Sequence, residues 1–432
     1  MQVKLPLSRL VKYLLIAVLL VGLGVFSQYR LGLVERTPWL ARLAGPNQTR
    51  RISSNTISSS SLSRILNGET PTDMDEVDMS VFWQTWKLLE DEYYLTDKLD
   101  PKKMVDGAVA GMVAALGDPY TAYLPPKENE LSGQRLAGAF FGVGIELGYS
   151  EEGILSVVSP LKGTPADEAG LQPGDLILNV KDEQKGIDEG TNQWSLDHAV
   201  ETIRGPKGTT VTLTLLREGG EAPFEVGLVR DEIVIHSVEL AYPEIDGKKV
   251  AHITLSSFGE RTEEEWNIAV EDILRNRSSI SGIVLDMRNN PGGLFDSAIY
   301  IASEFVRSGT IVSQKGKTNS TDYVSKGRHR LVDIPTVVMI NDGSASASEI
   351  VAGALKDQKN SKLIGTKSFG KGTVQDRIEL SNQGGVHITI AQWLTPKGTW
   401  IHEEGINVDI ESEDDPETAD IDEALVMAAA QL

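Results

Sequence analysis

The pattern of apolar and polar residues changes character several times along the chain. Near the N-terminus, the 17 residues from Tyr13 to Tyr29 include no charge and are rich in Leu and Val. A run of this length is at the short limit for a membrane-spanning helix. Because Lys4, Arg9 and Lys12 precede it, the positive-inside bias predicts a cytoplasmic N-terminus and an exported remainder. A cleaved signal peptide with its cleavage site near Ser27 is the alternative.

The next segments differ from that run in composition and period. We expect residues 1–29 to form a cytoplasmic stub and membrane anchor, and the Ser-rich residues 30–76 to form a flexible tether. Apolar residues then recur at three- and four-residue steps from Val81 to Tyr93 and from Met104 to Val113. This period predicts two helices in a small helical region, residues 77–131. We expect their apolar faces to pack into a core, with a dimer contact as the alternative.

Residues 132–230 combine short apolar runs with Gly and Pro turns, which predicts a β-rich domain. Strands are expected from Ile154 to Val158, from Leu176 to Val180 and from Val211 to Leu216. A helix is expected from its cap at Ser195 to Ile203.

Residues 231–412 alternate strand-like and helix-like segments, which favours an α/β core around a largely buried sheet. An acidic tail and a closing helix are expected in residues 413–432. Strands are predicted at 250–255, 282–287, 336–340 and 386–391, and helices at 263–275, 297–306 and 347–356.

Composition narrows the range of functions. The formal net charge of −21 disfavours binding to nucleic acid, because an acidic surface repels phosphate. The absence of cysteine excludes disulfides, thiolate nucleophiles and cysteine metal sites. No metal and no organic cofactor are predicted.

A glycine pair before a strand suggests a carboxylate-binding turn. Consecutive backbone N–H groups around such glycines can form an anion-binding nest, and the strand edge can pair with an extended peptide. A dinucleotide loop does not fit, because Leu147 stands where a third glycine is needed. An ordinary glycine turn is the other alternative. The candidate peptide-binding residues are Phe141, Gly142, Val143, Gly144 and Ile145.

A second candidate site lies where an apolar strand ends at Asn341 and a helix begins a few residues later. A serine at such a junction is exposed beside the free N–H groups of the helix start, which can stabilise an oxyanion. Ser344, Ser346 and Ser348 all stand in this turn, and each could instead only cap the helix.

A serine nucleophile needs a base. None of the six histidines stands in a recognisable triad context, and no His-Glu-x-x-His motif occurs. Lys371 lies between two glycines, and a buried lysine has a lowered pKa. In an extended chain Gln375 shares a face with Lys371 and could orient its amine. The alternative is a flexible glycine hairpin with a solvated lysine.

The Ser-Ala-Ser-Ala-Ser-Glu segment at 344–349, the Phe-Gly-Lys-Gly segment at 369–372 and Gln375 together resemble the C-terminal processing peptidases, also called tail-specific proteases. The resemblance implies a Ser–Lys serine peptidase with a PDZ domain. It implies that Ser346 is the nucleophile, Lys371 the general base and Gln375 the residue that positions the lysine.

Two further segments extend this resemblance. The strand and glycine turn from Leu285 to Gly293 are similar to the family signature, which implies an oxyanion hole formed by the backbone N–H groups of Gly292 and Ala347. The order of turns in residues 132–230 resembles the PDZ fold of bacterial exported proteases. Arg204 matches the border of that domain, where the family implies a regulatory role; a surface salt bridge is the alternative.

The expected protein is therefore of the α+β, multidomain class: a membrane helix, a small helical unit, and a PDZ-like domain before a ClpP/crotonase-like α/β peptidase core. The expected function is serine endopeptidase cleavage of exported or unfolded proteins near their C-termini. The catalytic part is expected outside a bacterial inner membrane that the chain crosses once. A homodimer or higher oligomer and an adaptor protein are open as partners. A non-catalytic PDZ-containing adaptor is the alternative function.

Overall fold

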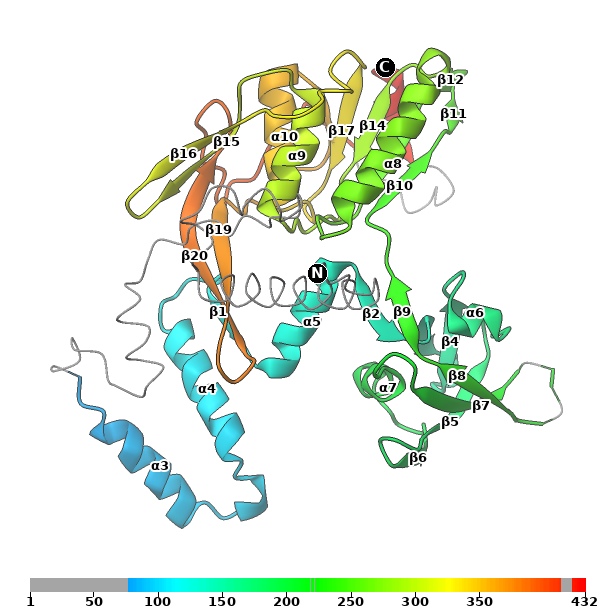
Figure 1. Ribbon diagram of the computed structural model, residues 1–432, viewed down its shortest axis with the longest axis vertical. Coiled ribbons are helices and arrows are strands. Elements are labelled where there is room, and N and C mark those ends of the chain that lie inside the picture. The colour runs from blue at the N-terminus through cyan, green and yellow to red at the C-terminus, as the bar shows by residue number, and fades with distance from the viewer. Residues whose placement is uncertain (1–76, 218, 221, 413–421) are drawn as a thin grey trace, which may run out of the picture. The chain divides into compact units, whose positions relative to one another are not determined.

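The computed structural model describes residues 77–217, 219–220, 222–412 and 422–432 (Figure 1). The expected anchor and tether, residues 1–76, lie outside the described residues. Within the described part of the chain, every helix is too short or too polar to cross a membrane. The chain divides into two units, Met1–Leu99 and Asp100–Leu432, and each is described by itself.

The first unit contains helix α3, Ser80–Glu92, and the 3₁₀-helix η3, Thr96–Lys98. The predicted helix is confirmed, but the expected core packing of its apolar residues is wrong, because none of its residues is buried. Val81 and Trp83 are each 62% exposed. The helical period of this segment therefore reflects its secondary structure and not a core among the described residues.

The second unit begins with helix α4, Pro101–Ala114, which is capped by the Asp100 carboxylate. Strand β1, Ala122–Leu124, and helix α5, Pro126–Ala137, follow. Helix α5 runs across the domain boundary expected between residues 131 and 132. A helix commonly ends at a residue with left-handed backbone geometry, and here that residue is Gly138, with φ of 65°.

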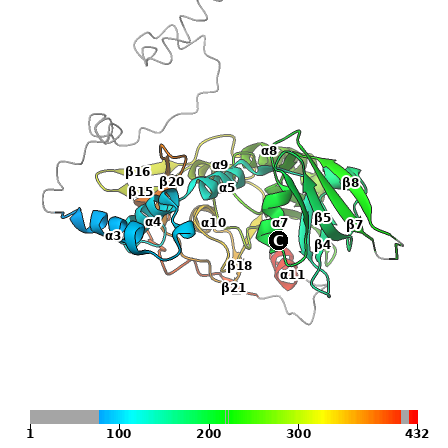
Figure 2. The same ribbon diagram turned by 90° about the horizontal axis from the view of Figure 1, so that it is seen from below.

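The β-rich domain is built on an antiparallel sheet of six strands in the order β3-β4-β5-β7-β8, with β6 paired to β5. Its core includes Ile177 and Leu213, and the Ser195 side chain caps α7 as predicted. Figure 2 shows α7 beside the sheet. The elements are β3 (Ile145–Tyr149), β4 (Leu155–Pro160), α6 (Pro165–Glu168), β5 (Leu176–Asp182), β6 (Ile187–Gly190), α7 (Leu196–Ile203), β7 (Thr210–Leu216) and β8 (Phe224–Val229).

A two-stranded ribbon closes this domain at its borders. Strand β2, Ala139–Gly142, enters the domain and pairs antiparallel with β9, Asp231–Val234, which leaves it. Next to the ribbon, the Arg230 guanidinium donates to the Asp182 carboxylate at 2.6 Å, and both side chains are 1% exposed. Such a buried pair is sensitive to loss of either partner, because the other charge is left without compensation.

The α/β core contains a six-stranded sheet in the order β10-β13-β14-β17-β18-β21. The pairs from β13 to β21 are parallel, and only β10 is antiparallel to its neighbour. Its elements are β10 (Val238–Ala241), β13 (Ala251–Leu255), α8 (Thr262–Arg275), β14 (Ile283–Asp286), α9 (Phe295–Phe305), β17 (Thr336–Ile340), α10 (Ala347–Ala354), β18 (Leu363–Gly365), β21 (Ile410–Glu411) and α11 (Glu423–Ala430).

Helices cover both faces of this sheet. Leu285 packs on one side in a cluster with residues of α8, α9 and α10, whereas Val284 packs on the other side with residues of α11. All residues of β14 and β17 are buried, as a parallel sheet between two helical layers requires. Each fully buried large apolar side chain contributes about 1.5–3 kcal/mol of stability.

A second sheet has the order β1-β20-β15-β16, with β19 also paired to β20. Arg377 of β19 donates to the Asn129 carbonyl and side chain at 2.8 and 2.9 Å, which fastens α5 to this sheet. The remaining elements are β11 (Glu244–Ile245), β12 (Lys248–Lys249), η4 (Arg277–Ser279), β15 (Thr310–Gly316), β16 (Ser320–Val324), the π-helix η5 (Leu355–Lys359), β19 (Thr373–Glu379) and β20 (Gly385–Leu394).

Strand register positions the candidate site. Leu285 of β14 lies opposite Val338 of β17, and Asp286 lies opposite Met339. Since the strands are parallel and adjacent, the loops that follow them meet at one edge of the sheet. These two loops are the glycine turn after β14 and the serine turn after β17.

Candidate active site

The serine turn places Ser346 directly before α10. Ser346 is the N-cap residue of this helix and has φ of 55° and ψ of −111°. Non-glycine residues rarely adopt positive φ, and such strain is concentrated at functional sites. The residue is partly exposed, whereas its neighbours in the turn are mostly buried.

Hydrogen bonds distinguish the three serines that the sequence leaves equivalent. The Ser344 hydroxyl donates to the Met287 carbonyl at 2.8 Å, and the Ser348 hydroxyl donates to the Asn290 carbonyl at 2.9 Å. Both side chains are completely buried. Ser344 and Ser348 therefore bind the serine turn to the loop after β14. Ser346 forms no such bond to that loop; it forms a capping box with Glu349 at the start of α10. Because its side chain is partly exposed and not tied to the glycine turn, Ser346 is the candidate nucleophile.

The buried Glu349 carboxylate joins the serine turn to the lysine loop. One oxygen, Oε2, accepts the backbone N–H groups of Ser346 at 2.7 Å and Lys371 at 2.9 Å. The other, Oε1, accepts the Ser368 hydroxyl at 2.6 Å and the Gly370 N–H at 2.7 Å. Burial raises the pKa of Glu349, and these hydrogen bonds offset only part of that effect. The sequence marks Glu349 only as part of a motif; its role as the junction was missed.

The glycines that flank Lys371 are required by a close approach of residues 400–405. A Cβ on Gly370 would lie 2.9 Å from the Gly405 nitrogen, and one on Gly372 would lie 2.8 Å from the His402 nitrogen. The expected close backbone approach at this loop is confirmed. The loop is thus packed, and the alternative of a flexible hairpin with a solvated lysine is wrong.

The Lys371 side chain is partly buried, and its amine lies over the Tyr120 ring, 5.2 Å from the ring centroid. Burial lowers the pKa of Lys371, while the negative charges of Glu349 and Asp118 oppose the shift. No hydrogen bond joins Lys371 Nζ to Ser346 Oγ in the part of the chain that the structure describes. The two loops are brought together, but proton transfer needs a closer approach of these two atoms.

Gln375 forms different contacts from those expected. Its Nε2 donates to the Thr373 hydroxyl at 2.9 Å and to the Thr389 hydroxyl at 3.1 Å. It forms no hydrogen bond with Lys371 among the described residues. The reason is strand register, since Gln375 lies opposite Thr389 across the β19–β20 pair. The roles of Ser346, Lys371 and Gln375 in catalysis stay predictions.

The two amides expected to form an oxyanion hole are adjacent, but one of them is engaged. A Cβ on Gly292 would lie 2.9 Å from both the Ala347 nitrogen and Ser346 Cβ, so only glycine fits there. The Gly292 N–H donates to Asn290 Oδ1 at 2.9 Å. The Ala347 N–H is the first of α10 and points from the helix start. The Gly292 peptide must therefore turn before both N–H groups can bind one oxyanion.

An ion-pair network supports the beginning of the glycine turn. Burial raises the pKa of Asp286, but hydrogen bonds from His252 and Arg288 outweigh this and bring it to about 2. Arg288 also binds Asp422, the residue that caps α11, at 2.6 Å. This network connects the C-terminal helix to the end of β14.

In the expected peptide-binding turn, some residues are buried or engaged within the domain, whereas others are exposed or lie at a sheet edge. Val143 O accepts the Ala166 N–H and Gly144 O accepts the Leu161 N–H, both at 2.9 Å, so the carbonyls are engaged within the domain. The Val143 side chain is buried in the core and cannot line a pocket. Ile145 begins β3, which is an edge strand of its sheet. Phe141 belongs to the β2–β9 ribbon and is 44% exposed.

Arg204 lies at the C-terminus of α7, with its guanidinium 4.0 Å from the centroid of the Phe140 ring. The described residues offer it no ion pair, which removes the surface salt bridge as its explanation. Arg204 therefore contacts the aromatic residue beside the glycine turn. Its regulatory role stays a prediction.

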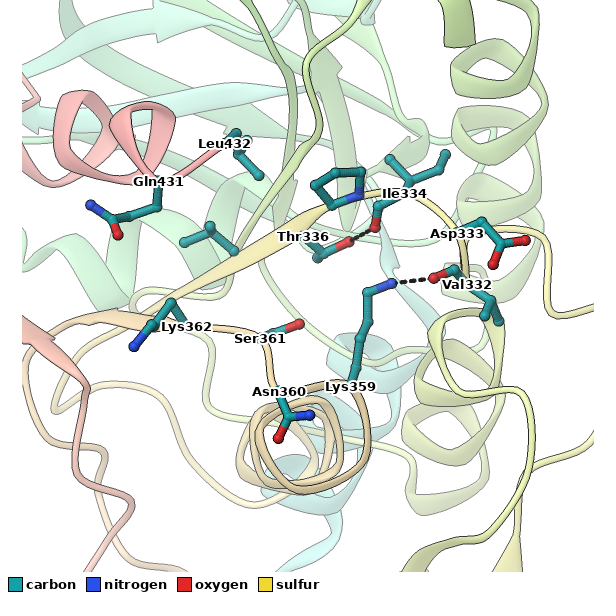
Figure 3. Close-up of a pocket in the computed structure, with 12 residues that line it drawn as sticks. Val332, Asp333, Ile334, Thr336, Lys359, Asn360, Ser361, Lys362, Gln431 and Leu432 are labelled. Carbon is teal, nitrogen blue, oxygen red and sulfur yellow. Dashed lines mark hydrogen bonds between the residues drawn. The ribbon is translucent and has the colours of Figure 1, made fainter.

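A separate hollow of about 400 Å³ lies at the opposite end of β17 (Figure 3). Thr336, the first residue of β17, lines it, and Lys359 Nζ donates there to the Val332 carbonyl at 2.5 Å. Because Ser346 follows the other end of the strand, this hollow is not part of the serine site. Among the described residues, no cluster of three or more His, Asp or Glu could bind a metal ion.

A serine at a helix start, a lysine loop bound to it through a buried carboxylate, and adjacent backbone N–H groups form a candidate site of the kind that a serine-type peptidase requires, on an α/β core. Family models agree with this class: peptidase family S41 matches residues 249–412, a PDZ domain matches 156–217, and the N-terminal domain of the activating protease CtpB matches 47–128.

Similar proteins carry the assignment further. The chain is 36% identical to the carboxy-terminal processing protease CtpA of Bacillus subtilis, over 76% of this chain and 68% of that protein. It is 38% identical to the carboxy-terminal-processing protease of Bartonella bacilliformis, over 72% and 70%. The photosystem II D1 C-terminal processing protease matches with a TM-score of 0.44 at 30% identity, covering 80% of this chain and 90% of that one. The identity and coverage of the two bacterial relatives show that the chain belongs to the carboxy-terminal processing proteases of peptidase family S41.

The Glu349 junction predicts a specific sensitivity. Replacement of Glu349 by Gln puts an NH₂ group, which cannot accept a hydrogen bond, in place of one carboxylate oxygen. In one orientation of the amide this group faces the N–H groups of Ser346 and Lys371, and in the other it faces the Gly370 N–H. Displacement of catalytic groups by even about 1 Å costs roughly a hundredfold in rate, so we expect kcat to fall by about that factor. Steady-state kinetics measure it, with the exposed Glu404→Gln as a control. Unchanged kcat in Glu349→Gln would contradict this role.

Proposed function

We propose that the chain is a serine endopeptidase that cleaves through an acyl-enzyme with Ser346 as nucleophile and Lys371 as general base. One observation carries this proposal: the Glu349 carboxylate binds the backbones of Ser346 and Lys371 at the same time, at 2.7 and 2.9 Å. Two segments far apart in sequence are thereby kept within side-chain reach. The pKa of Lys371, lowered by burial, favours the neutral amine that a base requires.

The reaction follows from these groups. Neutral Lys371 takes the Ser346 proton while Ser346 Oγ attacks the substrate carbonyl. The N–H groups of Ala347 and, after its peptide turns, Gly292 stabilise the oxyanion. The protonated lysine then gives its proton to the leaving amine and later activates the water that releases the acyl group. Gln375 holds the start of β19, the strand that directly follows the lysine loop, through its hydrogen bonds to Thr373 and Thr389.

Variants of the two reacting residues test the proposal. Ser346→Ala and Lys371→Ala are each expected to reduce cleavage of an unfolded casein-like protein by at least about a thousandfold, because nucleophile and base act as a unit. Lysine accepts a proton only when neutral, so kcat/KM of the native enzyme should rise with pH through the lowered Lys371 pKa.

The matched control is Lys367→Ala, which removes an exposed lysine four residues earlier and should retain activity. Native-level cleavage by Lys371→Ala, or a flat pH profile from mildly acidic to basic conditions, would reject lysine as the base. A non-catalytic adaptor would cleave nothing in any of these assays.

The PDZ domain is proposed to bind the free C-terminus of substrates. Support comes from the edge strand β3, which can pair with an added peptide strand, and from Gly144, whose φ of 76° helps to form a turn of consecutive N–H groups. A Cβ on Gly144 would lie 2.2 Å from Thr164 Oγ1, so the turn needs glycine.

Amidation of a substrate's C-terminus tests this role. A peptide with a free carboxylate should bind at least about tenfold more tightly than its amidated form, because amidation removes the charge that strengthens the hydrogen bonds from the N–H groups of the turn. Calorimetry with Ser346→Ala protein measures both affinities without cleavage. Equal affinities would show that the terminal carboxylate is not recognised.

We also propose that the uncharged run from Tyr13 to Tyr29 anchors the chain in a bacterial inner membrane, with the peptidase on the outer side. Protease added to spheroplasts should then digest the catalytic part without lysis, while the protein sediments with membranes. Protection of the catalytic part until lysis would place it in the cytoplasm.

A further inference from the structure

A row of aromatic rings lies beside the lysine loop, and the ring that contacts the lysine amine comes from before the PDZ domain. The Tyr120 ring lies under Lys371 Nζ at 5.2 Å and meets the His402 ring edge-on at 5.8 Å. His402 stacks on Trp400 at 5.1 Å, and the Trp400 indole N–H donates to the Gly372 carbonyl at 2.9 Å. The row of rings is therefore attached to the lysine loop itself.

A chain of hydrogen bonds fastens Tyr120 to the strands that follow the lysine. The Asp118 carboxylate accepts the Tyr120 N–H at 2.9 Å and the Thr121 hydroxyl at 2.6 Å. The Thr121 oxygen accepts the Thr389 N–H at 3.0 Å, and the Thr389 hydroxyl accepts the Gln375 amide. Strand β1 continues the attachment by pairing with β20. The position of the ring is thus built by the fold.

We propose that Tyr120 is a positioning residue for the general base, whose ring covers the Lys371 amine and excludes water from it. The inference rests on the proposed role of Lys371 as base. A segment on the N-terminal side of the PDZ domain would then complete the catalytic centre of a domain on its other side. The sequence offered no local signal for this, because Tyr120 and Lys371 are brought together only by the pairing of β1 with β20.

Two effects of the ring oppose each other. The face of an aromatic ring attracts an ammonium ion, which favours the charged amine. Removal of water disfavours the charged amine, and full burial can lower a lysine pKa by up to about 3–5 units. The separation of 5.2 Å is toward the long end for a cation–π contact. Exclusion of water is therefore expected to dominate.

The charges around the amine act in both directions. Asp118 and Glu349 favour its protonated form, yet burial outweighs them and the pKa of Lys371 is lowered. The groups that act on the lysine are Asp118 and Tyr120 from the loop before β1, Glu349 from α10 and His387 from β20. His402 and Glu403, from the segment after β20, act on Tyr120.

The test compares the pH dependence of kcat/KM in Tyr120→Ala and Tyr120→Phe full-length protein. Tyr120→Ala opens the amine to water, which raises the Lys371 pKa, so the rise of kcat/KM with pH should occur about one pH unit higher than in the native enzyme. Below that rise kcat/KM should be about tenfold lower than native, and at basic pH it should recover. Tyr120→Phe keeps the ring and should keep the native profile. Tyr94→Ala, at a tyrosine that is 93% exposed, is the matched control.

Other outcomes decide against the inference. The inference is overturned if kcat/KM of Tyr120→Ala rises at the same pH as in the native enzyme or at a lower pH. An equal loss of kcat/KM at every pH would overturn it as well. Should Tyr120→Ala fold poorly by circular dichroism, Tyr120→Gln fills more of the space than Ala but removes the ring and puts polar atoms beside the amine, so the same upward shift is required of it. Activity in Lys371→Ala would instead reject the proposed base, so the two failures can be told apart.

Discussion

A single buried carboxylate, that of Glu349, determines whether this site exists. Its two oxygens accept four hydrogen bonds, from the serine turn and from the lysine loop. An acceptor buried in this way is stable only when its donors are in place, because an unpaired buried charge is costly. The carboxylate thus couples the folding of the two loops. It also fixes the distance between the backbones of Ser346 and Lys371, since both bind the same oxygen.

The sheet supplies the second constraint. Parallel pairing of β14 and β17 brings the glycine turn to the serine turn, and Ser344 and Ser348 bind the two together. Of three similar serines, two bind the loops together, and the third, Ser346, is the proposed nucleophile. The same packing makes Gly292 irreplaceable, since a side chain there would occupy the space of Ser346 Cβ and the Ala347 nitrogen.

The sequence predicts the elements of the core well, because buried parallel strands such as β14 and β17 are uninterrupted apolar runs. It also singles out the serine turn and the lysine loop that Glu349 joins in the structure. It fails where distant segments meet: Tyr120 reaches Lys371 only through strand pairing, and Gln375 turns to Thr389 because of register. It fails at α3 too, where a helical period is not accompanied by burial.

The geometry separates the assembly of this site from its activation. The backbones of Ser346 and Lys371 are already fixed by Glu349, yet the lysine amine lies on Tyr120 and the Gly292 N–H is bonded to Asn290. Acyl transfer by the proposed route requires a closer approach of Lys371 Nζ to Ser346 Oγ and a turn of the Gly292 peptide. Neither the Lys371 amine nor the Gly292 N–H is among the donors to Glu349. A substrate carbonyl placed beside Ala347 would favour the turn of the Gly292 peptide, because it offers the Gly292 N–H an acceptor that becomes an oxyanion in place of a neutral amide oxygen.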